Sequence, residues 1–181
     1  MNGKDMRKVI AVVATILLFA TAFSGCLGGE KLVTRQASEF ILTASDILGN
    51  WTVIASTDYP TWGDNISNGA LRMYQNTFLN QTRITITVLI FVSIESAKLA
   101  LSNQSWLTTY SLPPGAKHSN PGIGDESQMV TMDLTGGFES KAMLFRKANV
   151  VVTGGVMYPE GTPLTDPWFI NLMKRQASKI E

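Results

Sequence analysis

Alternation of apolar and polar residues predicts that much of the chain forms a β-sheet. The clearest alternation lies in residues 83–92, where every second residue is a branched apolar one. The end of this segment is apolar on both sides, which is typical of a central strand covered on two faces. The alternating apolar positions are Ile84, Ile86, Val88 and Ile90. Shorter segments of the same kind predict five further strands, at 51–56, 70–78, 128–134, 141–147 and 150–157.

Turn-forming residues separate these strands. Residues 79–81, 135–138 and 148–149 predict tight turns, because Asn and Gly accept the backbone angles that such turns need. Residues 57–68 are predicted to form a polar loop, and 105–124 a loop of twenty residues. A loop of that length is uncommon in a compact domain unless it has a function.

Three segments show helical patterns. Residues 37–48 are mildly helical, and 94–102 follow Ser93, a suitable N-cap. The last helix is predicted to have Asp166 as its cap and Pro167 at its first position. Its apolar stripe is Phe169, Leu172, Met173, Gln176 and Ile180.

The order of these elements is βββα followed by βββα. This order predicts an α+β fold: an antiparallel sheet of about six strands with two to three helices, packed on one face, after an N-terminal signal or anchor helix. We expect one α+β domain over residues 36–181.

The N-terminus has the features of an export signal. Lys4, Arg7 and Lys8 precede an uncharged run at 9–23. As a helix this run extends about 22 Å at about 1.5 Å per residue, which is less than the roughly 30 Å of a bilayer's hydrocarbon core. That length fits a signal peptide better than a permanent span.

The residues after this run are Phe23-Ser24-Gly25-Cys26. They resemble the lipobox of lipoproteins, those of archaea in particular, although Leu is usual where Phe23 stands. The resemblance implies a signal peptide over 1–25, lipid on the Cys26 sulfur and a tether over 26–35, with the domain on the outer face of the cell membrane. Stable attachment needs two hydrocarbon chains. The alternative is an uncleaved N-terminal membrane anchor, which leaves the domain outside as well.

Charge and composition exclude several classes of function. Three of the 15 basic residues and one of the 14 acidic residues precede Cys26. The chain from Cys26 onward therefore carries 12 basic and 13 acidic residues. A near-neutral domain without a basic stripe is a poor nucleic-acid binder. The single Cys excludes an intrachain disulfide, and one His is too few for a zinc site. We therefore expect no metal, no other cofactor and no nucleic-acid partner.

Four Asn-X-Ser/Thr sequons agree with an exterior location. They permit glycosylation, although a polar surface rich in Asn and Thr explains them equally well. The acceptor residues are Asn50, Asn65, Asn80 and Asn103.

A second resemblance involves Ile123-Gly124-Asp125-Glu126 and the segment 145–152, FRKANVVV. Together they resemble an "iGDE … fRkGNvvv" pattern of small extracytoplasmic domains in bacteria and archaea. Many of these are uncharacterised lipoproteins, and some look like sensor domains of receptor kinases. Ala148 stands where the pattern has Gly. The resemblance implies a cell-envelope domain and supplies no catalytic residues.

No catalytic site is predicted from the residues themselves. Asp125 and Glu126 are adjacent, and neighbours on an extended segment point to opposite sides. We therefore expect no carboxylate pair. Asp125 is interpreted as a turn residue that binds backbone N–H groups. His118 is interpreted as a residue of a polar loop. The glycines at 135–137 lack the flanking residues of a phosphate-binding loop and suit a hairpin. Those at 153–155 suggest a bulge, or a place where a helix packs close to the sheet.

Aromatic residues in two loops are the candidate ligand surface. Tyr59 and Trp62 lie in the first loop, and Trp106 and Tyr110 lie near the start of the long one, which also holds His118. Exposed Trp and Tyr are favoured recognition residues. The alternative is that these rings close the open end of the core.

Three hypotheses follow. The leading one is a non-enzymatic, lipid-anchored surface module that contacts the membrane through Cys26 and binds or senses an envelope protein, a glycan or a small ligand. The second is an envelope hydrolase that uses Asp125, Glu126 or His118, which requires these groups to converge in a pocket. The third is a structural assembly lipoprotein, which needs an exposed apolar edge strand or patch.

Overall fold

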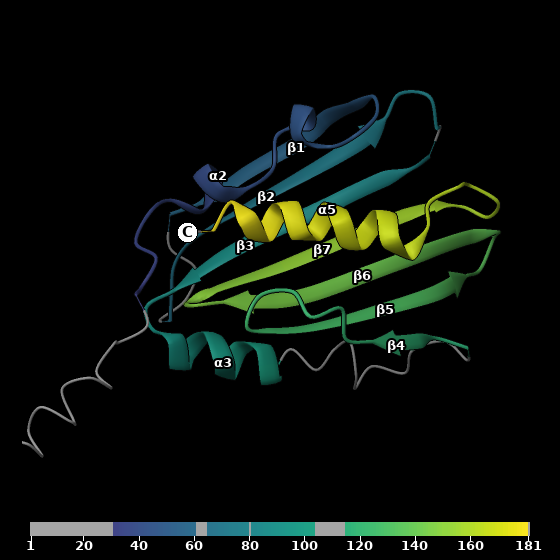
Figure 1. Cartoon of the computed structure of the whole chain (residues 1–181). Coiled ribbons are helices and arrows are strands. Elements are labelled where there is room, and N and C mark those ends of the chain that lie inside the picture. The colour runs from purple at the N-terminus through teal and green to yellow at the C-terminus, as the bar shows by residue number, and fades with distance from the viewer. Residues whose placement is uncertain (1–30, 61–64, 80, 104–114, 181) are drawn as a thin grey trace, which may run out of the picture. The chain divides into compact units, whose positions relative to one another are not determined.

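A computed structural model of the chain describes residues 31–60, 65–79, 81–103 and 115–180 (Figure 1). Leu32–Glu181 form one structural unit. No helix among the described residues has the length and apolarity needed to cross a bilayer. The helical elements are α2 (Ala37–Phe40), the 3-10 turn η1 (Ala44–Asp46), α3 (Ile94–Asn103) and α5 (Asp166–Ser178). The strands are β1 (Trp51–Tyr59), β2 (Ile66–Asn76), β3 (Arg83–Phe91), β4 (Lys117–Ser119), β5 (Glu126–Leu134), β6 (Phe138–Lys147) and β7 (Val150–Pro159).

The strands form a single antiparallel sheet in the order β1-β2-β3-β7-β6-β5-β4. Two meanders, β1–β3 and β5–β7, join where β3 pairs with β7, so the α+β class is confirmed. The sheet has seven strands rather than about six, because β4 pairs with β5 in a segment predicted as loop. Strand β2 also begins inside the predicted 57–68 loop, at Ile66.

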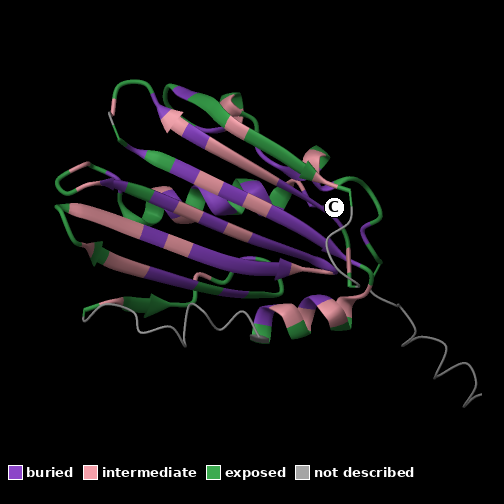
Figure 2. Ribbon diagram, turned by 180° about the vertical axis from the view of Figure 1, so that it is seen from behind, coloured by how far each residue is buried: buried purple, intermediate pink, exposed green. Residues whose placement is uncertain are grey.

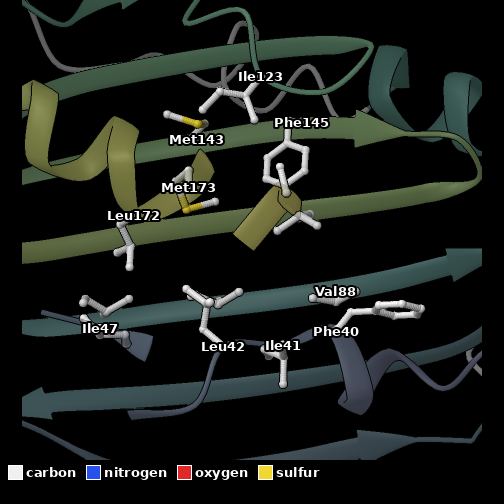
Figure 3. Close-up of a cluster of buried hydrophobic side chains, with 14 of the residues drawn as sticks. Phe40, Ile41, Leu42, Ile47, Val88, Ile123, Met143, Phe145, Leu172 and Met173 are labelled. Atoms are coloured by element: carbon white, nitrogen blue, oxygen red, sulfur yellow. The ribbon is translucent and has the colours of Figure 1, made fainter. Parts of the chain in front are cut away.

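One face of the sheet, called the inner face here, carries the main core. It contains the alternating residues of β3, all fully buried as predicted. Helix α5 crosses this face, and the N-terminal segment packs beside it (Figure 1). Figure 3 shows Leu172 and Met173 of α5 above the strands, with Phe40, Ile41 and Leu42 filling the space next to them.

The opposite face, called the outer face, carries a second and smaller core. Helix α3 covers it, with Ala97 and Leu101 buried against β3 and β7. The prediction that the helices share one face is therefore wrong. The cause is the doubly apolar end of β3, whose Leu89 and Phe91 point away from the inner core and need their own cover. Ser93 caps α3 as predicted, because its Oγ accepts from the N–H of Ser96 at 3.0 Å.

The predicted helix at 37–48 is also wrong, because only α2 and η1 form there. Between them Phe40, Ile41 and Leu42 are all buried, and one side of a helix cannot bury three consecutive residues. Gln176 of α5 holds this stretch extended: its amide accepts from the N–H of Leu42 at 3.0 Å and donates to the carbonyl of Phe40 at 3.0 Å. A tertiary contact thus replaces helical hydrogen bonds.

The N-cap of helix α5 lies one residue earlier in the chain than predicted. Thr165, not Asp166, is the N-cap, and its Oγ1 accepts from the N–H of Trp168. Asp166 instead accepts a hydrogen bond from Lys141 of β6 at 2.5 Å. All five residues of the predicted stripe are buried, so the helix and its orientation are confirmed.

Candidate functional site

The outer face of the sheet carries a hollow of about 270 Å³ at the end of β3 away from α3. Figure 2 shows this face from the side opposite α5, with many of its residues only partly buried. Strands β2, β3, β6 and β7 all contribute to the hollow, which makes it a feature of the sheet rather than of a loop. The lining residues are Met73, Arg83, Thr85, Ser140, Gly155, Val156 and Met157.

The hollow exists because Gly155 has no side chain. Gly155 lies between Thr85 of β3 and Ala142 of β6 in the sheet register. A Cβ added there would meet only the carbonyl oxygen of Lys141, at 3.9 Å, so the space above it is open. A glycine inside a strand often marks such a close approach, and this signal could have identified the site from the sequence.

The preceding glycine acts on the inner face. A Cβ on Gly154 would lie 2.3 Å from Cε of Met173, so its absence lets α5 approach the sheet. This confirms one of the two interpretations of 153–155, close helix packing. The two adjacent glycines thus have different roles, because successive residues of a strand face opposite sides.

The groups that line the hollow are suited to binding. Arg83 supplies a positive charge, and Thr85 and Ser140 supply hydroxyls that can donate and accept hydrogen bonds. Met73 and Met157 add adaptable apolar surface. Such a set matches an extended ligand with an anionic group, further polar groups and an apolar edge.

Asp125 and Glu126 converge on one buried guanidinium, contrary to prediction. Arg146 Nη1 lies 2.8 Å from Asp125 Oδ2, and its Nη2 lies 3.0 Å from Glu126 Oε1. The Arg146 side chain is 4% exposed, whereas the two carboxylates are 41% and 47% exposed. The two acids can converge because Asp125 precedes β5, whereas Glu126 is directly opposite Arg146 in the register.

Two residues next to this ion pair adopt the left-handed backbone conformation. Gly124 has φ +66°, and a Cβ on it would collide with the carbonyl oxygen of Arg146, at 2.2 Å. Ala148 adopts φ +52° where the related pattern has Gly, so the turn geometry holds despite the substitution. The Ala148 N–H donates to Asp125 Oδ2 at 2.8 Å. Asp125 therefore does bind a backbone N–H, but one that is distant in sequence.

Asn149, the next residue of the pattern, anchors the N-terminal segment. Its Oδ1 accepts from the N–H of Val33 at 2.7 Å, and its Nδ2 donates to the carbonyls of Val33 and Phe91 at 3.0 and 2.6 Å. The residues of the "iGDE … fRkGNvvv" pattern that this chain retains thus form a structural cluster at the β6–β7 turn. The structural roles of Asn149 and Arg146 were not predicted from the sequence.

The aromatic ligand surface is described only in part. Trp62, Trp106 and Tyr110 lie outside the described residues. Tyr59 ends β1 and His118 lies in β4, which are the two edges of the sheet. Six strand spacings of about 4.8 Å separate these edges, roughly 29 Å, so the structure does not bring Tyr59 and His118 to one site.

His118 is also distant from the two acids. It pairs with Val130 of β5, four residues beyond Glu126. At about 3.4 Å per residue this corresponds to about 14 Å along the strand. Asp125, Glu126 and His118 therefore do not form one catalytic cluster. Among the described residues, no group of three or more His, Cys, Asp or Glu side chains could hold a metal ion.

The predicted modification sites are described only in part. Asn50 and Asn65 are exposed, as glycosylation requires. Asn103 is the last residue of α3, while its side chain, Asn80 and Cys26 lie outside the described parts.

A polar cluster on the inner face ties the sheet to α5. Burial alone lowers the pKa of Lys141, but hydrogen bonds to Asp166 and Tyr158 outweigh it and raise that pKa. The Tyr158 hydroxyl donates to Glu139 Oε2 at 2.9 Å, and burial is the main cause of its raised pKa. All four groups have partners, so the cluster holds α5 in place.

The comparisons with known proteins concern the fold. No protein-family model and no curated protein matches the sequence. The structure is similar to the extracellular domain of PknH from Mycobacterium tuberculosis, with a TM-score of 0.57 and 12% sequence identity. The match covers 84% of this chain and 96% of that one. The two chains therefore share a fold over nearly the whole extracellular domain.

Proposed function

We propose that this protein is a lipid-anchored module on the outer face of the cell membrane. In this proposal it binds a ligand in the outer-face hollow without transforming it. The observation that carries the proposal is the hollow over Gly155, lined by Arg83 and two hydroxyl side chains. Shape and chemistry favour an acidic oligosaccharide or another extended anionic ligand of the envelope.

The exterior location rests on the N-terminal sequence and on the fold. Cys26 follows a charged and then apolar leader, and Asn50 and Asn65 are exposed sequon residues. The fold is similar to that of the extracellular domain of PknH. A sensing role, in which binding at the hollow is reported to another envelope protein, is one form of this proposal.

The two other hypotheses have weaker support. A hydrolase based on Asp125 and Glu126 would have to free them from Arg146, and His118 is too distant to assist. An assembly lipoprotein finds one favourable observation, since Val53 and Ile54 of the edge strand β1 are exposed. However, the pairing of β1 with β2 shifts register between Val53 and Ala55, and such a bulge discourages strand addition.

Location is tested by intact-mass analysis of the full chain recovered from its native membranes. We expect a mass that starts at Cys26 and includes two hydrocarbon chains, and we expect Cys26→Ser to remain unprocessed. Residues 1–25 still attached to an unmodified Cys26 would contradict the proposed lipid anchor and its location on the outer face of the membrane.

Ligand binding is tested by titrating neutral and acidic envelope oligosaccharides into the protein and recording calorimetric heats. We expect acidic ones to bind, Arg83→Gln to weaken binding at least tenfold, and Gly155→Leu to abolish it by filling the hollow. The matched control is Thr57→Leu, an exposed position of β1 outside the hollow. Equal binding by all variants, or cleavage of the oligosaccharide, would refute the proposal.

A further inference from the structure

A second cavity, of about 300 Å³, lies at the other end of β3. It is formed where the N-terminal segment passes the end of β3 and the starts of β2 and β7. We call it the tether-end cavity, because Leu32 and Val33, which lie in the second half of the predicted tether, contribute to it. Arg83 of the hollow and Phe91 of this cavity are eight residues apart on one strand, or about 27 Å.

Three polar side chains of the tether-end cavity already have partners within the domain. Asn149 bonds to the backbone of Val33 and Phe91. Asn68 accepts from the N–H of Ala37 at 2.7 Å, and Ser67 Oγ donates to the carbonyl of Ile90 at 3.0 Å. A polar ligand would find few free hydrogen-bonding groups here, so these side chains shape the cavity rather than recognise a polar occupant.

Two apolar residues at the rim of the cavity are exposed. Leu32 is 43% exposed and Val92 is 52% exposed, and both line the cavity. Exposed branched apolar residues around a concave surface are typical of a contact with an apolar partner. The partner must therefore offer hydrocarbon rather than charge.

Chain connectivity identifies that partner. Leu32 follows Cys26 by six residues, which span at most about 21 Å when fully extended. A lipid on the Cys26 sulfur therefore keeps this rim within about 21 Å of the membrane surface at all times. We propose, on the basis of the lipid anchor proposed above, that the tether-end cavity docks onto the outer leaflet, with Leu32 and Val92 inserted at the boundary of headgroups and hydrocarbon.

Docking has a consequence for the hollow. It fixes the domain with the tether end on the bilayer and holds the hollow up to about 27 Å further out. The open half of the outer face then remains accessible to envelope ligands. The lipid on Cys26 supplies the attachment to the membrane, and the docked rim sets the orientation of the domain on it.

The test uses the full, lipidated chain in vesicles of phosphatidylcholine and phosphatidylglycerol. Because lipid occupies the Cys26 sulfur, an introduced cysteine is the only free thiol and can carry a bimane label. Thr34→Cys places the label at the tether-end cavity, and Thr135→Cys is the matched control, an exposed threonine in the turn at the opposite end of the sheet. Brominated lipids quench a label only where it meets the hydrocarbon.

We expect quenching at position 34 to be at least three times that at position 135. Leu32→Glu combined with Val92→Glu should lower quenching at 34 to the control value. Phe78→Glu should leave it unchanged, although Phe78 is 76% exposed, because it lies beyond the far end of β2. Equal quenching at 34 and 135, or quenching insensitive to the two glutamates, would overturn the docking.

Two further outcomes separate the alternatives. Cross-linking of position 34 to a second copy without bromine quenching would overturn docking in favour of self-association. Labelling of the unsubstituted chain at Cys26 would show a free thiol, and this would overturn the lipid anchor and the docking together. A blocked Cys26 with equal quenching at both positions overturns only the docking.

Discussion

Replacing Arg146 by Met tests whether the buried guanidinium stabilises the fold. Met has a similar length and no charge, so the substitution removes the ion pairs without leaving a large void. Arg146 makes three hydrogen bonds to the carboxylates of Asp125 and Glu126, between 2.8 and 3.2 Å. A fourth, of 2.8 Å, goes to the carbonyl of Ala148.

The expected loss of stability depends on how exposed the two carboxylates are to solvent. Water can reach both carboxylates once Arg146 is gone, because each is nearly half exposed, so each lost ionic partner contributes about 1 kcal/mol rather than the larger value of a fully buried pair. The loss of the Ala148 hydrogen bond adds about 1 kcal/mol. We therefore expect Arg146→Met to lower the free energy of unfolding by about 3 kcal/mol, which corresponds to about 9 °C in Tm for a domain of this size.

Urea unfolding followed by circular dichroism measures this change. Lys98→Met is the matched control, since Lys98 also pairs with a glutamate, Glu95, at 3.1 Å, but both side chains are exposed. Exposed pairs contribute little, so this control should unfold close to the unsubstituted chain. A loss below about 1 kcal/mol for Arg146→Met, or equal losses for both variants, would refute the assignment of Arg146 as a structural residue.

Two further predictions follow from neighbouring contacts. Gly155→Ala should leave Tm unchanged or slightly raised in calorimetry, whereas Gly154→Ala should lower stability by about 1 kcal/mol, because its Cβ displaces the flexible end of the buried Met173 side chain; the reverse order would contradict the assignment of faces. The hydrogen bond from Lys179 lowers the pKa of Asp46 from 3.8 to about 2. Since that pKa is lower in the folded state, its stabilisation is present above about pH 4 and is lost between pH 4 and pH 2, by about 1 kcal/mol after allowance for solvent. Asp46→Asn should remove this step from a urea-unfolding series against pH, and an unchanged series would argue against the ion pair.

Strong local patterns predicted most of the fold. The alternation in β3, the turns between strands and the stripe of α5 each depend on residues close in sequence, and all three are confirmed. The segment 37–48 failed because its partner is Gln176, more than 130 residues away. Helical propensity is weak over so short a stretch, and a distant side chain can outweigh it.

The candidate site was less predictable than the fold. Asp125, Glu126 and His118 stand out in the sequence as chemical groups, yet the partner of the two acids, Arg146, comes from the neighbouring strand. The hollow was also not predicted, because its residues come from four strands and its centre is a glycine without functional groups. Adjacency across a sheet depends on register, and register is not visible in a single strand.

The sequence by itself predicted most of the succession of strands and helices from local periodicity, while the export signal and the lipid on Cys26, which the lipobox resemblance implies, stay predictions. Only the tertiary structure decided that α3 and α5 cover opposite faces and that β3 pairs with β7. It also decided that Gly154 closes a core while Gly155 opens a hollow. The physical reason is that a strand's two faces are distinguished only by what packs on them, and those partners are distant along the chain.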